Sequence, residues 1–230
     1  PTAPGSGDSP PKGVQMRIGV ALSQDGMNWC RVEGDHPSGA CLDVGGPGEW
    51  DRLFVGWPVV VNHKQKEFRM YYHALDPDSK KFRVGLATSQ DGLAWDKLGP
   101  VFDGGPQGSF DEGGVERRRV VEVDGVYHMV YEGLNSEGVH ALGLATSNDG
   151  VEWERNGDAP IFERSSPGSG AWDAGGVSNP ELVDMGDGRW YLYYAGFPEK
   201  QEGQAGPARS ALGLAVATDN DLTSWTRIET

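Results

Sequence analysis

The sequence predicts an all-β fold built from repeated four-stranded antiparallel blades, the architecture of a β-propeller. Two observations support this prediction. One hairpin phrase recurs four times along the chain, and a second strand phrase precedes three of those copies. Self-similarity at a long period of roughly 60 to 70 residues is typical of propellers and solenoids. We therefore expect four-stranded blades and almost no helix.

The hairpin phrase begins with Gly, has Asp-Gly in its middle and ends with Trp. Its copies cover 19–29, 85–95, 143–153 and, more loosely, 213–225. Asp-Gly accepts the positive φ that a tight turn demands, so each phrase predicts a hairpin whose second strand carries the Trp. Because a tryptophan ends every copy of the phrase, we assign all four to packing: Trp29, Trp95, Trp153 and Trp225.

The second phrase is an aromatic–Asp pair, a strand that begins with Val, and an aromatic-rich strand. The aromatic–Asp pairs are 50–51, 110–111 and 172–173. Added to the hairpin, this phrase completes four strands, the size of one blade. We expect the three aromatic residues to wedge between blades. The recurrence of the three aspartates indicates turn capping rather than catalysis.

The repeats define the domain organisation. Complete blades span about 50–98, 110–156 and 172–228, and a partial blade covers 17–34, so the propeller occupies 17–230. Residues 1–16 form a Pro/Gly/Ser-rich loop. A half blade leaves strand edges bare, which stable folds avoid, so we expect further sequence before the N-terminus to complete it.

Composition excludes some functions. A net charge of −14 repels phosphate backbones, so we expect no nucleic-acid partner. No apolar run approaches the ~20 residues of a membrane span. Cys41 aligns with the core positions 101 and 161, whereas Cys30 aligns with surface positions, so no disulfide is predicted. The histidines make no metal pair at short spacing, and we expect neither metal nor cofactor.

Candidate site residues are those that differ between repeats at positions where the neighbouring residues of the repeat are the same. Just inside the inner strands, the varying pairs are 56–57, 116–117 and 178–179. Glu116 is the acid among them. Strand alternation places Glu116 and Arg118 on one side and Arg117 on the other. Nearby arginines would lower the pKa of Glu116 and hold it ionised. The alternative is a buried Glu–Arg network.

Two further sets are weaker candidates. His73 and Glu132 follow equivalent tyrosines and would lie at the rim of a site. The run Arg117, Arg118 and Arg119 would either bind the anion of a phosphorylated or sulfated sugar, or form separate ion pairs.

Together these phrases resemble a known family. Aromatic-Asp, Val-x-x-Pro, Met-Tyr-Tyr and Gly-Leu-Ala-Thr-Ser-x-Asp-Gly-x-x-Trp are similar to blades of the five-bladed propellers grouped as arabinanase, levansucrase and invertase, with glycoside hydrolase families 43, 32 and 68. The resemblance covers about 17–228 and implies five blades, of which three and a half are present here.

The resemblance also implies three acids on successive inner strands: a base or nucleophile, a pKa-tuning Asp and a general-acid Glu. The general-acid position is Glu116, with Arg118 where a Pro is usual. Trp57 occupies the tuning-Asp position, and the base belongs one blade earlier, outside this sequence. Trp57 can stack on a sugar, but it can carry no charge.

The sequence therefore predicts a glycoside hydrolase-like propeller that acts on or binds a carbohydrate or another small polar ligand, with slow or no hydrolysis of simple glycosides. The alternative is a non-catalytic propeller that serves as a binding module or as a subunit with a protein partner. The predicted site has Glu116 as its catalytic residue and these binding residues: Trp57, Arg117, Arg118, Ser178, Asn179, His73 and Glu132.

Overall fold

The computed structural model describes residues 16–34, 36–199, 209–217 and 222–228. Residues 1–15 of the predicted 1–16 loop lie outside the described residues. The described residues form fourteen strands and no helix, which confirms the all-β prediction. With no helix in the described part of the chain, none there has the length and apolarity to cross a membrane.

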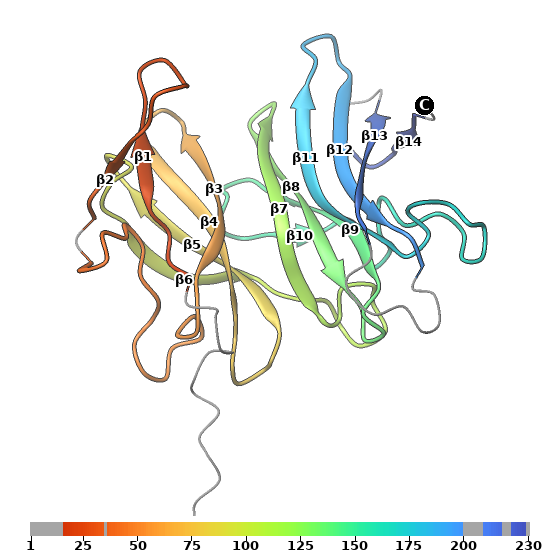
Figure 1. Cartoon of the computed structure of the whole chain (residues 1–230), viewed down its shortest axis with the longest axis horizontal. Helices are drawn as coiled ribbons and strands as arrows, with labels where there is room; N and C mark the ends of the chain where they lie inside the picture. The colour runs from red at the N-terminus through yellow and green to blue at the C-terminus, as the bar shows by residue number, and fades with distance from the viewer. Residues whose placement is uncertain (1–15, 35, 200–208, 218–221, 229–230) are drawn as a thin grey trace, which may run out of the picture. The chain divides into compact units, whose positions relative to one another are not determined.

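The chain divides into two compact units, 1–101 and 102–230. In the first unit, a two-stranded sheet precedes a four-stranded antiparallel sheet whose strands follow chain order (Figure 1). The strands are β1 (Val20–Leu22), β2 (Cys30–Val32), β3 (Gly56–His63), β4 (Glu67–Leu75), β5 (Phe82–Ser89) and β6 (Asp96–Phe102), whose last residue belongs to the second unit. The buried core packs the bridged residues Ile18 and Leu42 against the four-stranded sheet, and it contains Ile18, Leu42, Val55, Met70, Tyr72 and Ala87.

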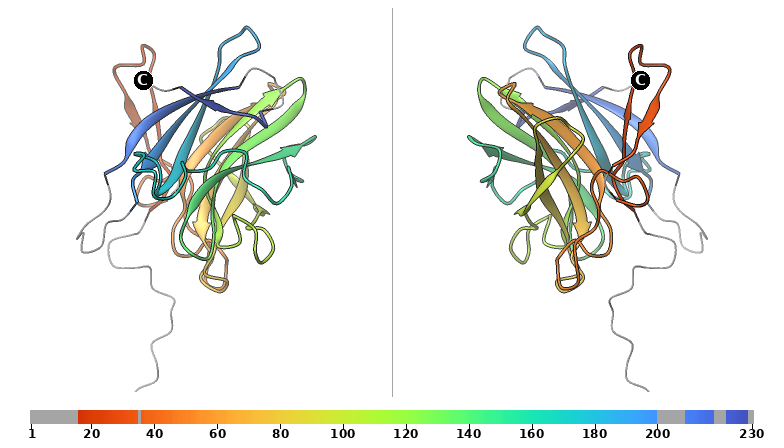
Figure 2. Two further views of the ribbon diagram at one scale, coloured as in Figure 1. Left: turned by 90° about the vertical axis from the view of Figure 1, so that its right-hand side faces the viewer. Right: turned by 90° about the vertical axis from the view of Figure 1, so that its left-hand side faces the viewer.

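The second unit contains two twisted antiparallel sheets of four strands each (Figure 2). The first sheet is β7 (Gly114–Val123), β8 (Val126–Leu134), β9 (His140–Ser147) and β10 (Glu154–Arg155). The second is β11 (Gly176–Asp184), β12 (Trp190–Phe197), β13 (Ala211–Ala217) and β14 (Thr226–Arg227). Strand β11 packs against β7, β8 and β9. A shared core that includes Val130, Leu144, Val177 and Leu192 fills the space between the sheets.

The hairpin turns are longer than the predicted tight turn. Leu22 pairs with Cys30, so residues 23–29 form the loop and the Trp precedes the second strand. The Asp25 carboxylate accepts backbone N–H groups of Met27 and Asn28, both at 2.8 Å. Asp91 and Asp149 cap their loops in the same way. A capped loop, rather than a two-residue turn, therefore sets the hairpin geometry.

The tryptophans of this loop differ in burial. Trp95 and Trp225 pack against the cores of their units, as predicted. Trp29 is 62% exposed, so its assignment to packing is wrong. It lies in the isolated β1–β2 hairpin, where its indole nitrogen donates to the carbonyl oxygen of Gly26 at 3.0 Å.

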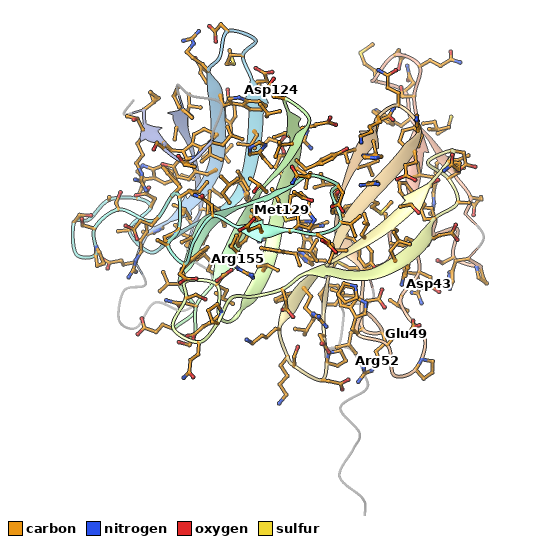
Figure 3. The ribbon with its side chains drawn as sticks, turned by 180° about the vertical axis from the view of Figure 1, so that it is seen from behind. Asp43, Glu49, Arg52, Asp124, Met129 and Arg155 are labelled. Carbon is orange, nitrogen blue, oxygen red and sulfur yellow. The ribbon has the colours of Figure 1, made fainter. Side chains whose placement is uncertain are left out.

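The recurring aspartates are structural, but through a different interaction from turn capping. Asp111 is buried and accepts a hydrogen bond from the Tyr131 hydroxyl at 3.0 Å and an ion pair from Arg155 at 3.1 Å. Arg155 is labelled in Figure 3. Equivalent clusters are Asp51–Tyr72–Lys97 and Asp173–Tyr194–Arg227. The preceding aromatic residues stack on the same tyrosines. Their predicted place between blades stays a prediction.

The two cysteines are free thiols, as predicted. Cys30 is exposed on β2, and Cys41 is half-buried against the core of the first unit.

The aromatic stacks explain the Gly that opens three of the four hairpin phrases, at Gly85, Gly143 and Gly213. A Cβ on Gly143 would lie 2.5 Å from ring carbons of both Phe110 and Tyr131, whereas a Cβ on Gly19 would meet nothing within 4 Å. We therefore expect Gly143→Ala to lower the free energy of unfolding by about 1–3 kcal/mol through overpacking. Gly19→Ala, at the same position of the repeat, is the matched control and should be near neutral. Urea unfolding measures both, and equal effects would contradict the packing argument.

Candidate functional site

The inner strands β3, β7 and β11 each contain a β-bulge at the same place in the repeat. The register shifts between Gly56 and Val59, between Val115 and Arg118, and between Ser178 and Glu181. Bulges commonly occur beside active sites because they redirect side chains. Glu116 and Arg117 both lie within the β7 bulge, whereas the pairs 56–57 and 178–179 each have their second residue within a bulge.

The bulge in β7 overturns the predicted alternation of Glu116 and Arg117. Val115 pairs with Gly133 and Arg118 with Tyr131, so both bulged residues lie opposite Glu132. The Arg117 guanidinium lies 3.5 Å from the Glu116 carboxylate instead of on the other side of the sheet. Strict two-residue periodicity fails wherever an extra residue enters a strand.

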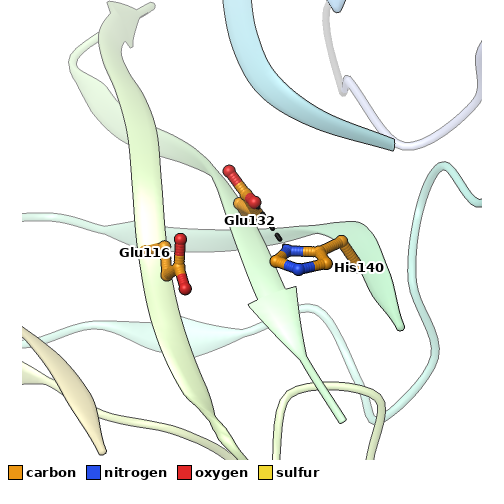
Figure 4. A group of neighbouring side chains, drawn as sticks. All are labelled: Glu116, Glu132 and His140. Atoms are coloured by element: carbon orange, nitrogen blue, oxygen red, sulfur yellow. Dashed lines mark hydrogen bonds and ion pairs between the residues drawn. The ribbon is translucent and has the colours of Figure 1, made fainter. Parts of the chain in front are cut away.

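Three titratable groups meet at this bulge: Glu116 on β7, Glu132 on β8 and His140 on β9 (Figure 4). Glu132 is fully buried at their centre. Its two oxygens lie 2.7 Å from His140 Nδ1 and 3.4 Å from Arg117 Nη1. Its carboxylate also accepts the backbone N–H of Asn179 at 3.2 Å. A buried carboxylate held by three donors is a fixed element of the site.

The protonation of Glu116 differs from the sequence-based expectation. Burial, together with the negative charge of Glu132, raises the pKa of Glu116 above its ordinary value and outweighs the charges of His140 and Arg117. The expectation that arginine would lower the pKa of Glu116 is therefore wrong. A carboxyl group that keeps its proton at higher pH is suited to general acid catalysis.

His140 responds to the same charges in the opposite sense. Burial alone would lower its pKa, but the hydrogen bond and charge of Glu132, with the charge of Glu116, raise it above the ordinary value. The cluster thus favours a protonated imidazole beside the buried Glu132. This residue was missed in the sequence, although a signal existed: its counterpart in the first unit is Phe82, because Leu75 pairs with Phe82 as Leu134 pairs with His140.

Glu116, Glu132 and His140 are residue types that bind metal ions, and one ligand atom from each of them lies within 4.8 Å of the others. However, the Arg117 guanidinium contacts both carboxylates, at 3.5 and 3.4 Å. A divalent cation would have to displace this positive charge. The arrangement is therefore better suited to proton transfer than to metal binding.

The two carboxylates differ in accessibility. Glu116 keeps 15% of its side chain accessible, whereas Glu132 has 0%. Their closest oxygens lie within 4.8 Å, less than the ~5–5.5 Å or more between carboxylates that flank a glycosidic bond. Glu132 therefore does not flank a substrate opposite Glu116. It acts on Glu116 electrostatically.

The other arginines of the run point elsewhere. Arg118 is buried and donates to the backbone carbonyl of Glu116 at 3.1 Å. Arg119 pairs with Glu181 of β11 at 3.2 Å. The three guanidinium groups therefore have separate partners, the alternative to a common anion site.

Ser178 and Asn179 bring β11 to the cluster. Ser178 is buried, and its hydroxyl oxygen accepts the Asn179 side-chain amide at 3.2 Å. Asn179 has a φ of +52°, a conformation that Asn tolerates better than most residues. From within the β11 bulge, its backbone N–H donates to Glu132.

Trp57 and His73 form a separate cluster in the first unit. Their rings stack with centroids 4.4 Å apart and planes inclined by 29°. His73 is buried, whereas Trp57 is 41% exposed. Gly56 pairs with His73 on β4, so this histidine has the place in its blade that Glu132 has in the next.

No protein-family model matches the sequence. A curated relative, the 1,2-β-oligomannan phosphorylase of Thermoanaerobacter sp. (strain X514), is 32% identical over 118 residues, which are 47% of this chain and 39% of that protein. The chain thus spans well under half of this relative.

Solved structures show the class of fold. A structure from glycoside hydrolase family 130, described as targeting β-1,2-mannosidic linkages in Candida mannan, aligns with a TM-score of 0.56 at 23% identity, covering 76% of this chain and 49% of that one. A glycosyl hydrolase from Bacteroides ovatus gives the same values. A family 117 glycoside hydrolase from Zobellia galactanivorans has a TM-score of 0.59 at 18% identity, covering 76% and 54%. The chain therefore has a glycoside hydrolase-like fold.

The raised pKa values predict a pH-dependent stability. Glu116 and His140 each bind a proton more tightly when folded than when unfolded, so their contribution to stability is present at low pH and is lost as the pH rises through their folded pKa values. We expect Glu116→Gln to make the loss of Tm between about pH 5 and pH 8 smaller than in the wild type. Differential scanning fluorimetry over this range measures the slope. Glu122→Gln, at an exposed position of the same strand, should keep the wild-type slope; an unchanged slope in Glu116→Gln would contradict the assignment.

Proposed function

We propose that this chain is part of a five-bladed β-propeller that acts on β-mannosides, with Glu116 as the proton donor to the leaving sugar oxygen. The observation that carries the proposal is the partly accessible Glu116 at the β7 bulge, whose protonated form is favoured by burial and by the adjacent Glu132. The four-stranded antiparallel sheets and the likeness to glycoside hydrolase structures support the propeller. The substrate class follows the mannoside-acting relatives.

The proposed roles follow from accessibility and charge. Glu116 contacts substrate, and Glu132 acts through Glu116 by raising its pKa. Arg117 and His140 neutralise Glu132 in its buried place. Ser178 and Asn179 lie beside Glu132 in the same unit, where they would contact sugar hydroxyls.

The reaction needs one proton donor and one nucleophile. As the bond between C1 and the glycosidic oxygen breaks, Glu116 transfers its proton to that oxygen, and the nucleophile forms the new bond to C1. Water as the nucleophile needs a second carboxylate as a base, whereas inorganic phosphate carries its own negative charge. The phosphorylase relative supports phosphate as the nucleophile. In the three-acid arrangement that the resemblance to arabinanases, levansucrases and invertases implies, a base would come from a further blade.

A non-catalytic binding module is the second candidate. Trp57 occupies the position that the three-acid arrangement assigns to the pKa-tuning Asp, and an indole cannot supply the negative charge of that aspartate. The assay below separates this candidate from the first, because a binding module would bind the glycan without turnover.

The function is tested with β-1,2-mannotriose in the presence and absence of inorganic phosphate. We expect wild-type turnover to be faster with phosphate and to produce mannose 1-phosphate. Glu116→Gln should lower kcat/KM by about 10²–10⁴, the usual contribution of a positioned proton donor. Glu122→Gln on the same strand is the control. Wild-type turnover that survives in Glu116→Gln would remove Glu116 from the mechanism.

The tuning role of Glu132 has its own signature. A proton donor fails at alkaline pH, where it loses its proton, so kcat/KM should fall as the pH rises through the pKa of Glu116. Glu132→Gln removes the carboxylate that helps to raise this pKa and leaves Arg117 in place. The alkaline limb should therefore move to lower pH, as measured in a full pH profile of kcat/KM. An unmoved limb with only a general loss of rate would assign Glu132 to structure alone.

A further inference from the structure

Trp57 has a backbone conformation that a bulky aromatic residue rarely adopts. Its φ is +48°, in the left-handed region, and it precedes Pro58. L-residues with a Cβ are strained at positive φ, and a following proline restricts the backbone further. Such strain persists only where the surrounding structure imposes it, and it gathers at functional sites.

The repeat itself shows which residue would relieve this strain. Asn179 occupies the same bulge position, also before a proline, with a φ of +52°. Asn visits the left-handed region readily because its short polar side chain bonds locally. The backbone conformation at position 57 by itself favours Asn or Gly. The presence of Trp indicates that its ring is needed there.

The indole ring is held in place and remains accessible. It stacks on buried His73 at 4.4 Å, and the edge of Phe54 contacts it with ring centroids 6.4 Å apart. His73 is fixed in turn by the edges of Phe54 and Phe82. Even so, Trp57 is 41% exposed. A rigid, partly exposed aromatic face is a binding surface with little conformational entropy to lose.

We propose that Trp57 is a stacking platform for a pyranose ring, and that its bulge conformation is retained for this purpose. This inference rests on the proposed function, from which it takes the ligand, a β-linked mannoside. In a β-mannopyranoside the hydrogens on C1, C3 and C5 are axial on one face, which makes that face apolar. This apolar face packs on one face of the indole, and His73 stacks on the other face.

The test uses Trp57→Asn, the residue that the chain already carries at the equivalent position of β11. Isothermal titration with β-1,2-mannotriose should show a Kd weakened about tenfold or more, the cost of losing an aromatic anchor. The Tm should be equal to or higher than that of the wild type, because Asn relieves the backbone strain. Trp57→Phe keeps an aromatic face and should retain most of the affinity.

Trp29→Asn is the control for the loss of an exposed indole outside the bulge and should leave the Kd unchanged. An unchanged Kd in Trp57→Asn would overturn the platform while leaving the proposed function standing. A lower Tm, or failure to fold, would assign Trp57 to packing and would also overturn it. If the wild type itself does not bind the trisaccharide, the proposed function fails, and this inference fails with it.

Discussion

The buried Asp–Tyr–cation cluster is the interaction on which each four-stranded sheet depends. In the β7–β10 sheet, Asp111 comes from the segment before the inner strand, Tyr131 from the second strand and Arg155 from the fourth. Burial, with the charge of Asp111, raises the pKa of the Tyr131 hydroxyl, so it stays a donor. Removing any one member would leave a buried polar group without its partner, which is far costlier than losing a surface contact. The cluster therefore fixes which residues of the three segments face one another.

The same cluster positions the candidate site. Successive side chains of a strand point to opposite sides, so anchoring Tyr131 toward Asp111 directs Glu132 to the other side of β8. There it meets the β7 bulge and His140. The first unit repeats this arrangement, with Tyr72 as the anchor and His73 beneath Trp57. In β12 the residue after the anchor is Ala195. In each sheet the anchoring tyrosine is thus followed by a residue that differs between sheets. The same backbone arrangement can therefore carry a different side chain in each sheet.

The protonation of Glu116 shows where sequence reasoning failed. Arginines adjacent in the chain suggested a lowered pKa, but the larger influences are burial and a carboxylate from the neighbouring strand. Of the predicted site residues in the second unit, Glu116, Arg117, Glu132, Ser178 and Asn179 lie together, whereas Arg118 turns into the interior. Internal comparison of repeats found these positions because it is sensitive to register. It could not assign their directions, because a bulge breaks the alternation on which direction depends.

The sequence by itself determined the all-β class, the four-stranded repeat, the places of the hairpins and the positions that differ between sheets. These features are encoded locally, in periodicity, turn residues and a phrase that recurs with little change. Only the tertiary structure decided that Trp29 is exposed, that Glu132 and His140 join Glu116, that Trp57 is strained, and that the pKa of Glu116 is raised. Each of these depends on contacts between separate strands and on exclusion of water, and neither is specified by a residue's neighbours along the chain.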